Sequence, residues 1–233
     1  MTNYYCLVTG LPELSLEDGK LSYTVANFKT EIYPELSKTD KKLVDLFYLK
    51  FDNANLLTLL KDKEALVDAS LGNYSADELL SVIASFKEET APDKKFPTYF
   101  YEFAELYLNT PDEERWGLED KLHGFYYNHA MKSGNPFVSA WFELNLDVNN
   151  ILAAMVARKY KMDVAKVPVG ENLVAEALRS SNARDFGLAD DLEYFEQLVR
   201  INDTADLVER EKKIDLLKWN WMEDNTFFNY FTI

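Results

Sequence analysis

Residues 47–63, FYLKFDNANLLTLLKDK, and residues 142–159, FELNLDVNNILAAMVARK, are two versions of one pattern at an offset of 95 residues, from 47 to 142. A leucine-rich chain matches itself by chance at some apolar positions, so the repeated Asp-x-x-Asn is the most informative part of the match. We therefore expect a duplicated helical unit. The identical pairs are Phe47 and Phe142, Leu49 and Leu144, Asp52 and Asp147, Asn55 and Asn150, and Leu57 and Leu152. The similar pairs are Phe51 and Leu146, Leu56 and Ile151, Leu60 and Met155, and Lys63 and Arg158.

The spacing of the apolar residues in both segments is typical of a helix that packs into a core. Asp and Asn three residues apart, at the junction of two helical runs, can accept hydrogen bonds from free backbone amides and cap the second run. The basic residue that follows, Lys63 or Arg158, is expected near the C-terminal end of that helix, where a cation is favoured. We therefore predict a capped helix-to-helix joint in each copy, with a ligand site at either Asp-Asn pair as the alternative.

Helix signals continue along the chain and predict an all-α fold. Leucine outnumbers the β-branched apolar residues, and only 8 Gly and 7 Pro are spread over 233 residues. A polar start at Ser37 precedes the first copy. Two capping boxes are expected, Ser75 with Glu78 and Thr110 with Glu113, and the second begins a long helix that Ser133-Gly134 ends. Two more helices are predicted around residues 192–199 and 207–217.

Charge and cysteine content restrict the partners and the compartment. The net charge of −15 repels phosphate backbones and anionic lipid heads, so neither nucleic acid nor a membrane surface is an expected partner. A basic protein partner or simple solubility would explain the charge. Cys6 is the only cysteine, which excludes an intramolecular disulfide and favours the reducing cytoplasm. No stretch approaches the roughly 18 apolar residues that a membrane span requires.

Several residue groups carry chemically active side chains, but none forms a complete site. Glu119, Asp120 and His123 offer a carboxylate-histidine pair for a metal, but His129 lies six residues after His123, on another helix face. Cys6 is expected to be a buried, inert thiol. The carboxylates Asp190, Asp191, Glu193, Glu209 and Glu211 are expected on a solvated, salt-bridged surface, and the aromatic residues are expected mostly in the core. We therefore predict no catalytic residue, no metal and no cofactor.

A third copy of the unit is expected to begin near the end of the chain. Asn135-Pro136-Phe137-Val138-Ser139-Ala140-Trp141, which leads into the second copy, is echoed by Asn225-Thr226-Phe227-Phe228-Asn229-Tyr230-Phe231. The Asp-x-x-Asn of that copy would fall beyond Ile233, so we expect truncation within a third unit. The predicted division is a first bundle over residues 1–95, a second over 96–190, and the start of a third over 191–233.

The second copy combines a phenylalanine-rich helix, Asp-x-x-Asn, the basic run Ala157-Arg158-Lys159-Tyr160 and the stretch Pro168-Val169-Gly170-Glu171-Asn172-Leu173. This order of features resembles the C subunit of archaeal and bacterial V-type ATPases and ATP synthases, whose eukaryotic counterpart is the d subunit. The resemblance covers residues 137–178 and, more weakly, 47–63. The opening NYYCLVTGLPELSLED, residues 3–18, is similar to an uncharacterised bacterial family encoded within V-type ATP synthase operons.

The resemblance implies three similar helical bundles that form a funnel on the membrane rotor ring and receive the foot of the central shaft, without catalysis. It predicts a cytoplasmic protein, peripheral to the inner membrane through these partners, in a complex that couples proton or sodium ion transport to ATP. The chain departs from the pattern in being shorter, in having two complete motifs, and in carrying Lys63 where arginine is usual. The alternatives are a free-standing helical enzyme with a metal site near Glu119–His129 and an unrelated helical adaptor.

Overall fold

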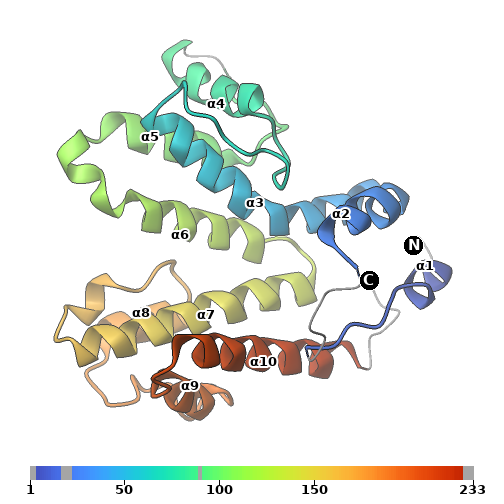
Figure 1. The fold of residues 1–233 in the computed structure, drawn as a ribbon. Coiled ribbons are helices and arrows are strands. Elements are labelled where there is room, and N and C mark those ends of the chain that lie inside the picture. Colours follow the sequence, from blue (N-terminus) through green and yellow to red (C-terminus); the bar gives the residue numbers. More distant parts are fainter. Residues whose placement is uncertain (1–3, 17–22, 89–90, 228–233) are drawn as a thin grey trace. The chain divides into compact units, whose positions relative to one another are not determined.

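The computed structural model describes residues 4–16, 23–88 and 91–227, and in these ranges the chain forms helices and loops without a strand (Figure 1). This confirms the all-α prediction. The α-helices of the described ranges are α1 (Tyr5–Thr9), α2 (Val25–Asn27), α3 (Lys38–Lys61), α4 (Ala76–Glu88), α5 (Thr98–Asn109), α6 (Leu118–Met131), α7 (Pro136–Lys159), α8 (Leu173–Ser180), α9 (Phe195–Asn202) and α10 (Leu207–Thr226). Shorter helical turns are the π-helix η1 (Phe28–Ile32) and the 3-10 helices η2 (Tyr33–Glu35), η3 (Asp112–Gly117) and η4 (Val164–Lys166).

The chain divides into two compact units. The first combines Met1–Val44 with Asp203–Ile233, and the second is Asp45–Asn202. Both Asp-x-x-Asn segments belong to the second unit. These boundaries differ from residues 95 and 190, where the sequence placed the ends of its bundles, and the three-bundle division stays a prediction.

A polar network in the first unit sets the start of α3. The Ser37 hydroxyl accepts a hydrogen bond from the Asp40 amide at 3.2 Å and donates one to the Asp40 carboxylate at 2.6 Å. The Tyr4 hydroxyl donates to the same carboxylate at 2.6 Å and accepts from the Ser37 amide at 2.7 Å. The hydrogen bonds from Ser37 and Tyr4 lower the pKa of Asp40. The predicted polar helix start at Ser37 is confirmed.

The core of the second unit is a series of helices that pack against their neighbours in the sequence. α4 packs on α5, α5 on α6, α6 on α7, and α7 on both α8 and α9 (Figure 1). Each helix contributes fully buried apolar side chains, whose removal from water is the main stabilising contribution. Examples are Leu79, Ile83, Phe100, Phe103, Leu122, Ile151 and Leu198.

An aromatic cluster joins the two repeated helices to α6. The rings of Phe47 in α3 and Phe142 in α7 have centroids 5.1 Å apart, and Tyr126 of α6 meets Phe142 edge-on at 5.5 Å. The Tyr126 hydroxyl donates to the Leu46 carbonyl at 3.0 Å, which satisfies its polar end. The first identical pair of the repeat therefore consists of two residues that contact each other.

The two predicted capping boxes have different outcomes. The first is confirmed, because the Ser75 amide donates to Glu78 Oε2 at 2.8 Å and the Glu78 amide donates to Ser75 Oγ at 3.3 Å. The second is wrong. Thr110 is the C-cap of α5, where its hydroxyl donates back to the Leu106 carbonyl at 2.7 Å, and the next helical turn, η3, has Pro111 at its N-cap without a side-chain cap. The predicted long helix is accordingly divided into η3 and α6.

The remaining helix boundaries follow the sequence closely. α6 ends before Gly134, whose φ of +78° only glycine adopts without strain, and α9 and α10 occupy the two predicted C-terminal regions. Asn225, which matches Asn135 in the predicted third copy, lies in the last turn of α10, whereas Asn135 caps the start of α7. The third copy stays a prediction. Residues 228–233 of that copy lie outside the described residues. Across the described ranges, none of the helices is long and apolar enough to span a bilayer.

Candidate functional site

The first Asp-x-x-Asn motif holds the loop between α3 and α4. Asp52 is fully buried in α3 and accepts hydrogen bonds from the backbone amides of Asn73 at 2.9 Å and Tyr74 at 3.1 Å. Its second oxygen accepts from the Asn73 side chain at 2.9 Å. One turn further along the helix, Asn55 donates from Nδ2 to the Asp68 carbonyl at 2.9 Å. A single carboxylate that accepts from two backbone amides and one side-chain amide makes this a strong anchor.

The second motif holds the loop between α7 and α8 in a related way. Asp147 Oδ1 accepts from the Asn172 side chain at 2.7 Å, and Oδ2 accepts from the Tyr194 hydroxyl at 3.2 Å. Asn150 makes two hydrogen bonds with the Val169 backbone, one to the carbonyl and one from the amide, both at 2.8 Å. Asn172 is also the N-cap of α8, so Asp147 fixes the residue that starts the next helix.

The predicted helix-to-helix joint is wrong in its location. Both motifs lie inside unbroken helices of 24 residues, α3 and α7, and bind the loop that follows each helix. Amides in the middle of a helix already donate to carbonyls four residues earlier, so these side chains form hydrogen bonds with backbone and side-chain groups that follow each helix instead. The four Asp and Asn side chains are buried and hydrogen-bonded within the protein.

The loop after α3 and the loop after α7 each contain a glycine at the point where the loop backbone lies close to the preceding helix. A Cβ on Gly72 would lie 2.3 Å from Asp52 Oδ1, and a Cβ on Gly170, whose φ is +78°, would lie 3.0 Å from Leu146 Cδ2. Sequence reasoning included Gly170 in its motif and missed Gly72, together with the partner residues Asn73 and Tyr194. The available signal was Gly followed closely by Asn before a helix start in both copies.

We expect Gly72→Ala to destabilise the protein by about 2–4 kcal/mol. The added methyl group would push the Asp52 carboxylate away from the backbone amides that donate hydrogen bonds to it. Urea unfolding followed by circular dichroism measures the change. Gly117→Ala is the matched control, since its Cβ would meet no atom within 4 Å. Equal stability of the Gly72 and Gly117 variants would contradict the close packing at Gly72.

The basic residues of the two copies do not occupy equivalent positions. Arg158 lies in the last turn of α7, as predicted, with its guanidinium 3.7 Å from the centroid of the Phe186 ring and a hydrogen bond to the Arg184 carbonyl at 2.6 Å. Lys63 lies beyond the end of α3, whose last turn carries Lys61, so the predicted cation in the last turn is wrong for Lys63. Arg158 stabilises a packed loop, whereas Lys63 is exposed.

Asp147 has a pKa well above the usual value for an aspartate. Its burial raises the pKa to about 6, although the hydrogen bonds from Asn172 and Tyr194 act in the opposite direction. Glu143, one turn earlier in α7, raises the pKa further through like charge. Asp147 has side-chain donors in place of the two backbone amides that serve Asp52.

This raised pKa predicts a pH-dependent contribution to stability. Because the folded pKa lies above the usual value of 3.8, the contribution is complete below that value and is lost as pH rises through about 6. We expect the loss between pH 4 and pH 7 to reach about 2–3 kcal/mol. Asp147→Asn removes the titration, so the stability difference between wild type and variant should change over this window in urea titrations. A difference that stays constant with pH would contradict the prediction.

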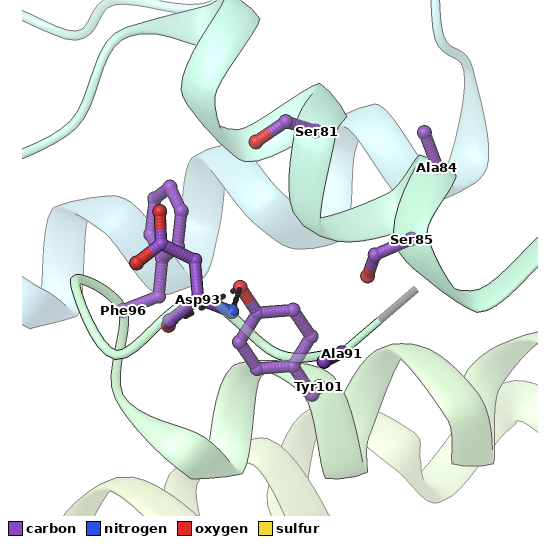
Figure 2. A pocket seen from close by; sticks show the side chains of 7 residues that line it. All are labelled: Ser81, Ala84, Ser85, Ala91, Asp93, Phe96 and Tyr101. Carbon is purple, nitrogen blue, oxygen red and sulfur yellow. Dashed lines mark hydrogen bonds between the residues drawn. The ribbon is translucent and has the colours of Figure 1, made fainter. Parts of the chain in front are cut away.

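The pocket in Figure 2 lies beside α4 and the start of α5 and has a volume of about 430 Å³. Both serine hydroxyls donate to carbonyls of α4, Ser81 to Glu78 at 2.6 Å and Ser85 to Val82 at 2.7 Å. The Tyr101 hydroxyl accepts from the Asp93 amide at 3.0 Å. Asp93 is the only carboxylate among the lining residues and none of them is basic, so they contain no acid-base pair. The lining residues are Ser81, Ala84, Ser85, Ala91, Asp93, Phe96 and Tyr101.

The histidines do not form a metal centre in the described ranges. His123 is exposed, whereas the half-buried His129 packs against Tyr99 with ring centroids 5.3 Å apart. Burial lowers the pKa of His129, and Lys132 lowers it further. Within those ranges, no three His, Cys, Asp or Glu side chains are placed to hold one ion.

Cys6 is exposed, so the prediction of a buried thiol is wrong. Tyr4 is buried by its contacts with Ser37 and Asp40, and a residue two positions later points about 200° around a helix axis, away from that contact. The carboxylates of α10 agree with the predicted salt-bridged surface, since Glu209 and Lys213 form an ion pair at 2.8 Å. Asp190, Asp191 and Glu193 are exposed.

Comparison with known proteins gives a family but no activity. Residues 1–233 match the family described as "Protein of unknown function (DUF2764)". No curated protein and no solved structure matches the chain.

Proposed function

We propose that this chain, which belongs to the DUF2764 family, is a non-catalytic component of a V-type ATP synthase or ATPase, similar to the C subunit of those complexes. In this role it links the proteins of the central shaft to the membrane rotor ring and sits at the cytoplasmic side through those partners. The complex would couple proton or sodium ion transport to ATP. The proposal includes an arrangement of repeated bundles like that of the C subunit.

The observation that carries the proposal is the use of buried polar groups in both copies of the motif. Asp52, Asn55, Asp147 and Asn150 direct their hydrogen bonds to the loops after α3 and α7. Buried polar networks with satisfied partners make a packed structure specific and stiff, although desolvation opposes their burial. Such anchors suit a protein that transmits force, and they lie in the segments that resemble the C subunit.

The charge of the chain supports the same role. A net charge of −15 favours basic protein surfaces and disfavours direct contact with anionic lipids. A protein that connects shaft and ring needs broad protein contacts and no reactive group. Mechanical coupling would then depend on core packing and on the anchored loops.

Copurification from native membranes tests the proposal. A tagged full-length chain, expressed from its own locus, is expected to recover the shaft and ring proteins after gentle detergent extraction and crosslinking. A tagged acidic cytoplasmic protein of the same host is the control. Recovery of neither shaft nor ring proteins by the tagged chain, with the complex intact in the same extract, would overturn the assignment.

A further inference from the structure

Trp116 is the most exposed of the four tryptophans, with 90% of its surface accessible to solvent. It lies in η3, between α5 and α6, and the sequence had placed it on a long helix with the aromatic residues mostly in the core. Trp141, Trp219 and Trp221 are half-buried. An exposed tryptophan presents a large apolar ring that gains free energy when a partner covers it.

Arg115 holds the turn that presents Trp116. Its guanidinium lies 4.3 Å from the centroid of the Tyr107 ring. Its Nε donates to the Thr110 carbonyl at 2.9 Å and to the Tyr107 carbonyl at 3.2 Å, and it forms an ion pair with Asp112. The turn is therefore tied to the C-terminal end of α5. A partner that covers the tryptophan loses little free energy to ordering of this backbone.

The surroundings of Trp116 are strongly acidic. Five exposed carboxylates lie within four residues of Trp116 in the sequence. The one basic residue in the same window is Arg115, which forms an ion pair with Asp112. These charges repel phosphates and anionic lipid heads and attract cations. The indole face also attracts lysine and arginine through its ring quadrupole. The five carboxylates belong to Asp112, Glu113, Glu114, Glu119 and Asp120.

We propose that residues 112–120 form a docking surface, here called the Trp116 turn, for an amphipathic helix of another protein that carries lysine and arginine. An apolar side chain of that helix covers the indole, and its cations lie against the surrounding carboxylates. Tryptophan is a frequent energetic centre of protein interfaces, and complementary charge around such a centre sets specificity and association rate. Docking at the Trp116 turn does not depend on the ATP synthase role.

The test uses the full-length protein and a fluorescent synthetic helix of about 18 residues, five turns long, with leucine on one face and lysine on the other. We expect saturable binding by fluorescence anisotropy that weakens as salt increases. Trp116→Ala should weaken it about tenfold or more. Trp116→Phe should retain part of the affinity, because it keeps an apolar ring with a weaker cation attraction. Leu66→Ala, which removes a fully exposed side chain from another loop, should have no effect.

Two further comparisons separate this site from general charge attraction. Glu113→Gln with Glu114→Gln should weaken binding more than Glu193→Gln with Glu196→Gln, although both pairs remove the same charge from exposed positions. A helix with glutamate in place of lysine should not bind. Equal affinity of wild type and the folded Trp116→Ala variant, or equal effects of the two glutamine pairs, would overturn the proposal.

Discussion

Replacing Asp52 by alanine is expected to lower the free energy of unfolding by about 3–5 kcal/mol. The carboxylate is fully buried and accepts from the backbone amides of Asn73 and Tyr74 and from the Asn73 side chain. Its removal leaves these partly buried donors without the acceptor that they have in the wild type. The cost of an unsatisfied buried donor exceeds the net value of an ordinary hydrogen bond.

The measurement is urea unfolding of wild type and variant at constant pH, with circular dichroism and tyrosine-tryptophan fluorescence as independent probes. Asp77→Ala, at an exposed position in the first turn of α4, is the control and should cost less than about 1 kcal/mol. If the two alanine variants lose similar stability, Asp52 does not anchor the loop. Hydrogen exchange should also show faster exchange at the Asn73 and Tyr74 amides in Asp52→Ala before global unfolding.

Replacing Phe142 by alanine is expected to cost about 3–5 kcal/mol, because a large buried ring leaves a cavity among Phe47, Tyr126 and Tyr127. Its exposed fraction is 4%, whereas that of Phe47, the equivalent residue of the first copy, is 36%. Phe47→Ala is therefore the matched control and should cost roughly half as much or less.

Urea unfolding of Phe142→Ala, Phe47→Ala and the double variant measures both the single effects and their coupling. We expect the double variant to lose less than the sum of the two, since the rings contact each other at a centroid distance of 5.1 Å. Strict additivity would mean that the contact between the repeated helices contributes nothing beyond burial. Equal single effects would show that burial does not decide the difference.

The helices and their repeat were accessible from the sequence because the signals are local. The apolar spacing of residues 47–63 and 142–159 predicted helices, and these segments lie largely in α3 and α7. The capping box at Ser75 and Glu78 was correct for the same reason, since its partners are three residues apart. Thr110 has the same sequence pattern, but its hydroxyl donates a hydrogen bond to a carbonyl of the preceding helix.

The hydrogen-bond partners of the Asp-x-x-Asn motif could not be predicted from local sequence signals. Asp52 reaches Asn73, 21 residues later, and Asp147 reaches Tyr194, 47 residues later. No local rule specifies which loop folds back on which helix face. The pattern therefore identified Asp52 and Asp147 as structurally important but predicted the wrong role for them. It predicted caps at a joint between two helices, whereas both side chains hold a loop that follows their helix.

Burial of single residues differed from expectation wherever it depended on distant contacts. Cys6 is exposed, whereas Tyr4 makes the contact with Ser37 and Asp40. Trp116 is exposed in a turn that Arg115 fastens to α5. Composition, charge and periodicity established an acidic, all-helical chain with a repeated motif, since these can be read from the order of the residues without knowledge of their contacts. The anchored loops and the exposed tryptophan came from the folded chain, because hydrogen bonds and burial are settled by atoms that lie far apart in the sequence.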